Sequence, residues 1–198
     1  MRLGGERLER PVVEGDELFE LLRPVLGQPD AASNVNTAYG MNTPQSVLFI
    51  PDPLNSGRTR LVVGDYGNHR VLIWNDLPSQ NRPADAVVGV PDVHTLPTGT
   101  GYGSSPESNL AAPVSIASDG TRLIVGDQIF HRLLIFDRLP GPSSDGFPSS
   151  ANALWGESDF AFTDVNAGQG MVNALGLTEP RSFLEARPGG AYFVSDAV

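Results

Sequence analysis

Short apolar runs alternate with short polar segments along the chain, and the clearest case is the stretch LVVGDYGNHRVLIW at residues 61–74. Two apolar runs flank a brief polar turn there, which is the pattern of a β-hairpin. A second copy, LIVGDQIFHRLLIF, occupies residues 123–136. Both copies place Gly-Asp before the turn and His-Arg after it. The chain therefore contains a repeated hairpin.

The repeat is larger than the hairpin, because three further markers recur in the same order around it. A proline precedes the hairpin, an aspartate stands between the first apolar run of the hairpin and its turn, and a glycine lies in a phrase that reads VLGQPD, VVGVPD or LWGESD. The markers are Pro44, Pro113 and Pro180; Asp65, Asp127 and Asp196; and Gly27, Gly89 and Gly156. Chance similarity does not explain three markers in one order.

Each full unit predicts four strands. The predicted strands are residues 46–50, 61–64, 71–74 and 86–90 in the first unit and 114–117, 123–126, 133–136 and 153–156 in the second. A proline at a strand entrance costs no ladder hydrogen bond. Four short strands in tandem are the pattern of a β-propeller blade. A β-sandwich is the structural alternative, but it does not need the same hairpin at a constant step.

The markers divide the chain into an N-terminal segment and a partial β-propeller. The segment is residues 1–22, the propeller is residues 23–198, and the blade units lie near 42–92, 111–159 and, incomplete, 178–198. One more strand is expected near Val25. Propellers close with about 4 to 8 blades, so we expect a piece of a longer protein, with closure by association of copies as the alternative. Uncovered end sheets predict a chain that is poorly soluble, oligomeric or partly unfolded alone.

The motif VGDYGNHRVLIW and the proline-led strand before it resemble the NHL repeat, which reads Pro, a short strand, a strand ending in Ala-Asp, then Asn-x-Arg-Val and an apolar strand. The VLGQPD phrase is similar to one that joins units in a bacterial variety with longer blades. The resemblance covers residues 23–198, although Phe130 stands where the family has Asn. It implies an all-β fold, a β-propeller of NHL-repeat type with about two complete four-stranded blades plus partial blades at both ends.

The charge balance argues against one class of partner. The 198 residues include 13 basic residues, all Arg, and 23 acidic ones, for a net charge of −10, whereas nucleic-acid binding needs clustered positive charge. No apolar run approaches the roughly 20 residues of a membrane-spanning helix, and residues 1–22 lack the apolar core of a signal peptide. The chain has no Cys, which excludes disulfides and thiolate metal sites. An extracytoplasmic location is implied by the resemblance alone.

The recurring polar residues are predicted to serve the scaffold. Aspartates in tight turns accept backbone N–H bonds, and Asp65 faces Arg70 across its hairpin, where an ion pair would fix the turn. Asp127 and Arg132 are the equivalent pair. The predicted structural set is Pro44, Asp65, Arg70, Pro113, Asp127, Arg132, Pro180 and Asp196.

Two histidines, His69 and His131, occupy equivalent positions after the turn. Histidine is a common metal ligand, but equivalent positions recur with the blade itself, so the simpler interpretation is a turn residue that defines the repeat. No nucleophile motif, phosphate-binding loop or metal-ligand spacing is present. We therefore expect no catalytic residue, no metal and no cofactor.

The loops hold the remaining candidates. His94 and Tyr102 lie in a Gly-, Ser- and Thr-rich segment, and Phe147 lies in a similar one; a solvated linker is the alternative for each. The long inserts are residues 51–60, 93–109 and 141–151. Trp74, Phe136 and Trp155 fall at strand positions and are expected between blades.

Two functions from different classes remain. The first is a non-catalytic binding scaffold that presents blade loops to a protein, peptide or glycan partner, because insertions in repeat proteins map to loops around a regular core. The second is a fragment of a propeller enzyme, related to lyases or lactonases and other hydrolases, whose metal site lies partly in missing blades. The predicted first strands carry serines but no His, which favours binding.

Overall fold

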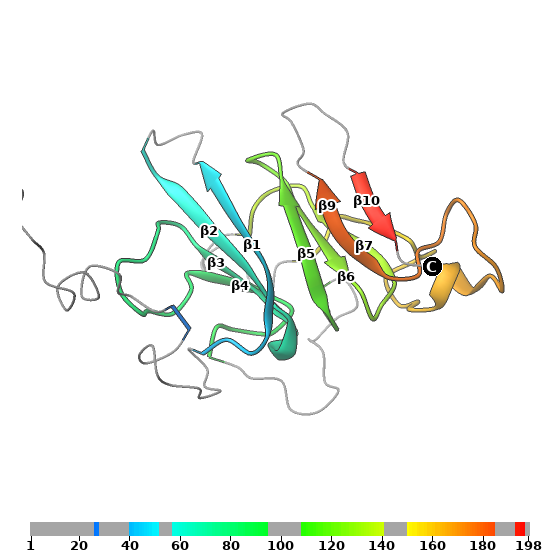
Figure 1. Ribbon diagram of the computed structural model, residues 1–198, viewed down its shortest axis with the longest axis horizontal. Helices are drawn as coiled ribbons and strands as arrows, with labels where there is room; N and C mark the ends of the chain where they lie inside the picture. The colour runs from blue at the N-terminus through cyan, green and yellow to red at the C-terminus, as the bar shows by residue number, and fades with distance from the viewer. Residues whose placement is uncertain are drawn as a thin grey trace, which may run out of the picture.

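A computed structural model describes residues 26–27, 40–51, 57–94, 108–140, 150–184 and 193–196. Within these ranges the chain forms ten strands in three antiparallel sheets, together with two short 3-10 helices (Figure 1). The all-β class and the four-stranded antiparallel sheets predicted from the sequence are therefore confirmed. Residue 25, where a further strand was predicted, lies outside the described part, and the neighbouring residues Leu26 and Gly27 form a turn.

The first two sheets have the same strand order, in which each strand pairs with the next one along the chain. The first sheet comprises β1 (Pro44–Pro51), β2 (Thr59–Asp65), β3 (Arg70–Trp74) and β4 (Ala86–Val88). The second comprises β5 (Pro113–Ser118), β6 (Leu123–Asp127), β7 (Arg132–Phe136) and β8 (Ala153–Trp155). The third pairs β9 (Pro180–Leu184) with β10 (Phe193–Asp196). The 3-10 helices are η1 (Tyr66–Asn68) and η3 (Val165–Gly168).

The two repeated hairpins share one register. Asp65 lies opposite Arg70, and Asp127 lies opposite Arg132, at the turn end of each pair. The predicted pairing of residues 61–64 with 71–74 is therefore confirmed. Each turn is completed by a histidine, His69 or His131, in the left-handed region, with φ of 54° and 52°.

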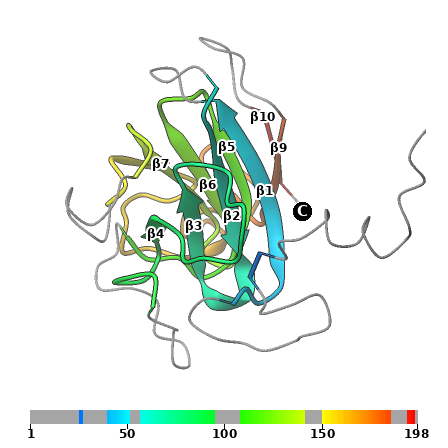
Figure 2. The same cartoon turned by 90° about the vertical axis from the view of Figure 1, so that its left-hand side faces the viewer.

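The apolar alternation along the strands gives each sheet two packing faces. One face of the first sheet, including Val62, Ile73 and Val88, packs against Leu134 and Phe136 of the second sheet in the largest apolar core. The opposite face of the second sheet carries Ala117, Ile124 and Leu133 on the side of the third sheet, where β5 packs against β9. Figures 1 and 2 show the consequence, a row of three sheets with β1, β5 and β9 side by side. In the described part of the chain this row is open and forms no closed ring.

The three large aromatic residues expected between blades have different environments. Phe136 lies in the core between the first two sheets, as predicted. Trp74 is buried, but in a second cluster with Leu61 on the outer face of the first sheet. The prediction for Trp155 was wrong, because its side chain is 57% exposed. Val88, the equivalent residue one repeat earlier, is fully buried by the next sheet, which shows that burial at this position depends on a neighbour over β8.

Candidate functional site

The first candidate feature is the polar network at the tip of the first hairpin. Asp65 accepts a hydrogen bond from the backbone N–H of Asn42 at 2.7 Å, and its second oxygen accepts from Asn68 Nδ2 at 2.9 Å. Arg70 Nε donates to the same oxygen at 2.9 Å, and both charged side chains are completely buried. The carboxylate therefore joins three parts of the blade, which are the turn, the third strand and the segment before β1.

The second hairpin repeats this network with one change. Asp127 accepts from the backbone N–H groups of Ala111 and Ala112, at 3.0 and 2.8 Å, while Arg132 Nε lies 4.0 Å from the carboxylate. Phe130 replaces the asparagine and places its ring 5.1 Å from the Arg132 guanidinium carbon. Burial raises the pKa of Asp127, and the backbone N–H bonds and the Arg132 charge offset only part of this increase.

The third aspartate follows the same pattern. Asp196 accepts hydrogen bonds from the backbone N–H groups of Thr178 and Glu179, at 2.9 and 2.7 Å. In each repeat these backbone donors come from the segment just before the marker proline. In the second repeat the backbone N–H of Phe130 also bonds to Asp127, which is the donor within the aspartate's own turn that the sequence predicted. The carboxylate thus fixes the entry of the first strand.

The arginines extend the network to more distant segments. Arg70 donates to the carbonyls of Gly40 and Val93, at 2.8 and 3.1 Å. Arg132 donates in the same way to the carbonyls of Asn109 and Phe160, at 3.1 and 2.6 Å. Each guanidinium therefore holds the segments that enter and leave its sheet.

The histidines connect one sheet to the next. Nδ1 of His69 lies 2.5 Å from the carbonyl oxygen of Ala111, and His131 makes the same contact with the carbonyl of Thr178. Because a carbonyl oxygen only accepts, Nδ1 carries the proton in both contacts. Among the described residues, no group of three or more His, Cys, Asp or Glu side chains could hold a metal ion.

Glu157 is a charged group that the sequence did not single out. Both carboxylate oxygens are shielded from solvent, and the residue follows the marker glycine at the position that Val90 holds in the first repeat. Burial raises the pKa of Glu157, and the nearby Asp164 charge raises it further, against the smaller opposing influence of His131 and Arg132. This carboxylate therefore sits in an unfavourable environment for a negative charge.

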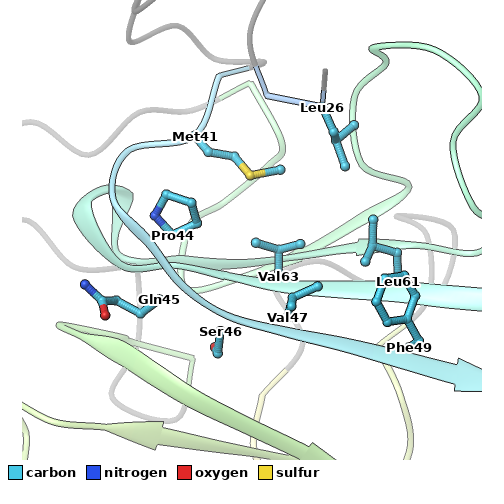
Figure 3. A pocket seen from close by; sticks show the side chains of 9 residues that line it. All are labelled: Leu26, Met41, Pro44, Gln45, Ser46, Val47, Phe49, Leu61 and Val63. Carbon is cyan, nitrogen blue, oxygen red and sulfur yellow. The ribbon is translucent and has the colours of Figure 1, made fainter. Parts of the chain in front are cut away.

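The second candidate feature is an apolar groove of about 400 Å³ on the outer face of the first sheet (Figure 3). Its floor is formed by side chains from β1 and β2, and Leu26 and Met41 stand opposite them. The lining residues are Leu26, Met41, Pro44, Gln45, Ser46, Val47, Phe49, Leu61 and Val63. Val47 and Phe49 are 60% and 57% exposed, so an apolar surface of the strand is accessible to a partner.

The sequence did not predict the groove. Val47 and Phe49 were assigned only to a strand, and whether a strand face is covered depends on neighbours far away in the chain. The signal was present in the repeat, because Val47 corresponds to Ile116 in the pairing register, and Ile116 is buried between sheets.

The loop candidates contribute less to the described structure. His94 is exposed, and its backbone N–H donates to Asp92 at 2.8 Å. Tyr102 and Phe147 lie outside the described residues. Their predicted binding role stays a prediction.

Comparison with known proteins gives no assignment. A scan against protein-family models found no matching family, and a search of curated proteins found no matching relative. Among the described residues, none of the helices has the length and apolar character required to cross a membrane. The interpretation of the site therefore rests on the geometry of the sheets and their polar links.

Proposed function

We propose that this chain is part of an NHL-type β-propeller and acts as a non-catalytic binding scaffold for a protein, peptide or glycan partner. The repeat order, the shared hairpin register and the row of stacked antiparallel sheets support the propeller type. In this proposal the aspartates, arginines and histidines of the hairpins are structural, because their contacts are with the chain itself.

The observation that carries the binding role is the groove. Val47 and Phe49 expose apolar surface on the first sheet, and exposed apolar patches of this kind mark interaction sites. The loops that connect the strands begin and end on these sheets, and loops held by rigid scaffolds are common binding elements. We expect the groove and the neighbouring loops to form one binding surface.

A displayed library of random peptides, selected on the complete chain, tests this role. Selected peptides should bind wild type in calorimetry and lose at least tenfold in affinity for the double variant Val47→Asp, Phe49→Asp. Leu175→Asp is the matched control, since Leu175 is 76% exposed and lies outside the groove. A selection that yields only peptides insensitive to the double variant contradicts the groove as the site.

A metal titration addresses the enzymatic alternative. Calcium, zinc and manganese ions should each fail to produce saturable binding that depends on the hairpin residues. Stoichiometric binding of one of these ions that Asp65→Ala abolishes, at a temperature where the variant is folded, would show that the aspartates form a functional centre and would contradict the scaffold role.

A further inference from the structure

We infer that the groove on the first sheet binds the third sheet of a second copy of this chain, so that copies associate head to tail. This inference rests on the proposed binding role and names the partner. It follows from the internal repeat, because the packing of the first sheet on the second shows which surface of the repeat covers the face that is open on the first sheet.

The residues that form the groove floor correspond to residues that are buried elsewhere in the molecule. Val47 pairs with Val63 in the first sheet, and the equivalent pair in the second sheet is Ile116 with Val125. Both members of the second pair lie in the core between the first and second sheets. The groove is thus the same face of the repeat without its covering sheet.

The repeat also shows which surface covers this face. Val62 and its pairing partner Leu48 belong to the face of the first sheet that packs on Ile116. In the second sheet the equivalent pair is Ala117 with Ile124, which lies on the side of the third sheet. In the third sheet, the same register position is held by Leu184 with Phe193.

The strands that line the groove and the strands of the third sheet also correspond to each other. Among the described strands, β1 and β2 line the groove. Trp74 and Val87, on the outer half of the same face, are buried in the cluster that also contains the groove residues Leu61 and Val63. The third sheet consists of two strands in the described part of the chain, and these are the counterparts of β1 and β2. The described strands of the third sheet are thus the counterparts of the strands that line the groove.

The contact uses different surfaces on the two copies, so it is heterologous and forms either a ring or an open filament. The described residues of each copy form three sheets. Counted on these residues, two copies that close on each other would give a ring of six sheets, within the roughly 4 to 8 blades of closed propellers.

Sedimentation of the complete chain over a wide concentration range tests the association. We expect a dimer that dissociates on dilution, and a shift to monomer at all concentrations for the double variant Val47→Asp, Phe49→Asp. Leu175→Asp should behave as wild type. A wild-type chain that stays monomeric at 100-fold above the lowest concentration, or association unaffected by the double variant, overturns the inference.

Cysteine cross-linking tests the head-to-tail geometry, and the absence of native Cys makes it unambiguous. A mixture of one chain carrying Val47→Cys and another carrying Phe193→Cys should form a disulfide-linked heterodimer, while Val47→Cys with Leu175→Cys should not. Efficient linking of Val47→Cys to itself indicates groove-to-groove contact and overturns the inference. If the chain is monomeric but still binds selected peptides in the groove, the inference fails and the proposed function stands.

Discussion

At the scale of single residues, the two hairpins allow the same Asp–Arg pair to be compared in two different environments. In the first hairpin, Asn68 donates a hydrogen bond to Asp65, and Arg70 Nε lies 2.9 Å from the same carboxylate. Phe130 cannot donate such a bond, and the Asp127–Arg132 separation is 4.0 Å. The aromatic ring instead contacts the guanidinium, as in other cation–π pairs. One change in the turn therefore redistributes the contacts of a buried arginine.

Removal of one partner from the Asp65–Arg70 pair should lower the free energy of unfolding. Asp65→Ala leaves Arg70 as a buried charge without its carboxylate, and losses of this kind are about 3 to 5 kcal/mol. The double variant Asp65→Ala, Arg70→Leu should be less destabilised than the single variant, because no uncompensated charge remains. Urea unfolding measures both. The coupling free energy should be larger for this pair than for Asp127 and Arg132, and equal coupling would count against the role of Asn68.

The buried carboxylate of Glu157 gives a prediction about pH. Its pKa is raised in the folded protein, so the ionised form costs stability above the unfolded pKa, and this cost is relieved as the pH falls through the folded value. Glu157→Gln should therefore unfold at a higher temperature than wild type at pH 7, with the difference disappearing in acid. Asp164→Asn is the control, since it removes the like charge and should give part of the gain. A constant difference between pH 7 and pH 4 contradicts this explanation.

At the scale of strands and turns, the marker glycines explain why the fourth strands are short. The sequence predicted strand to residue 90, but β4 ends at Val88, and Gly89 has a φ of +100° with its hydrogen atoms against the His69 carbonyl. A Cβ at this position would lie 2.4 Å from that oxygen. Gly156 repeats the arrangement against His131, with φ of +102°. The glycine thus lets the strand end against the tip of its own hairpin.

Alanine at the marker glycine should destabilise the sheet. Gly89→Ala combines an unfavourable φ, which costs about 1 to 2 kcal/mol, with a backbone clash, so we expect a loss greater than that range. Gly170→Ala is the control, because no atom lies within 4 Å of its added Cβ and its φ is not positive. Thermal unfolding measures both variants. Similar melting temperatures for the two would show that the backbone relaxes freely at Gly89.

Most strands could be predicted because alternation and turn residues are local signals. The hairpin register followed from Asp and Arg at the two ends of one turn. The exposure of Trp155 and of Val47 could not be predicted in this way, because each depends on which sheet lies over the strand. The aspartates' bonds to the segment before each first strand were missed for a related reason, since that segment is distant from the hairpin in the sequence.

At the scale of the whole molecule, the histidines add a polar contact between each sheet and the next, beside the apolar cores. The contact of His131 with the Thr178 carbonyl joins the second sheet to the segment that enters the third. His131→Ala should loosen β9 and β10 while the first sheet is unaffected. Hydrogen exchange measured by mass spectrometry should show faster amide exchange at residues 181–184 and 193–196. His94→Ala, a change in an exposed loop, should leave amide exchange at these residues unchanged. Faster exchange spread evenly over all three sheets contradicts this role.

The histidine contacts also have a consequence for the order of folding. Each one spans a similar, moderate stretch of chain, 42 residues from His69 to Ala111 and 47 from His131 to Thr178, and each joins neighbouring sheets. Cooperativity in such an array passes only between nearest neighbours. A hairpin must close before its histidine can hold the entry strand of the following sheet. Neighbouring sheets should therefore be added one at a time, with a completed hairpin serving as the template for the entry strand of the sheet that follows it.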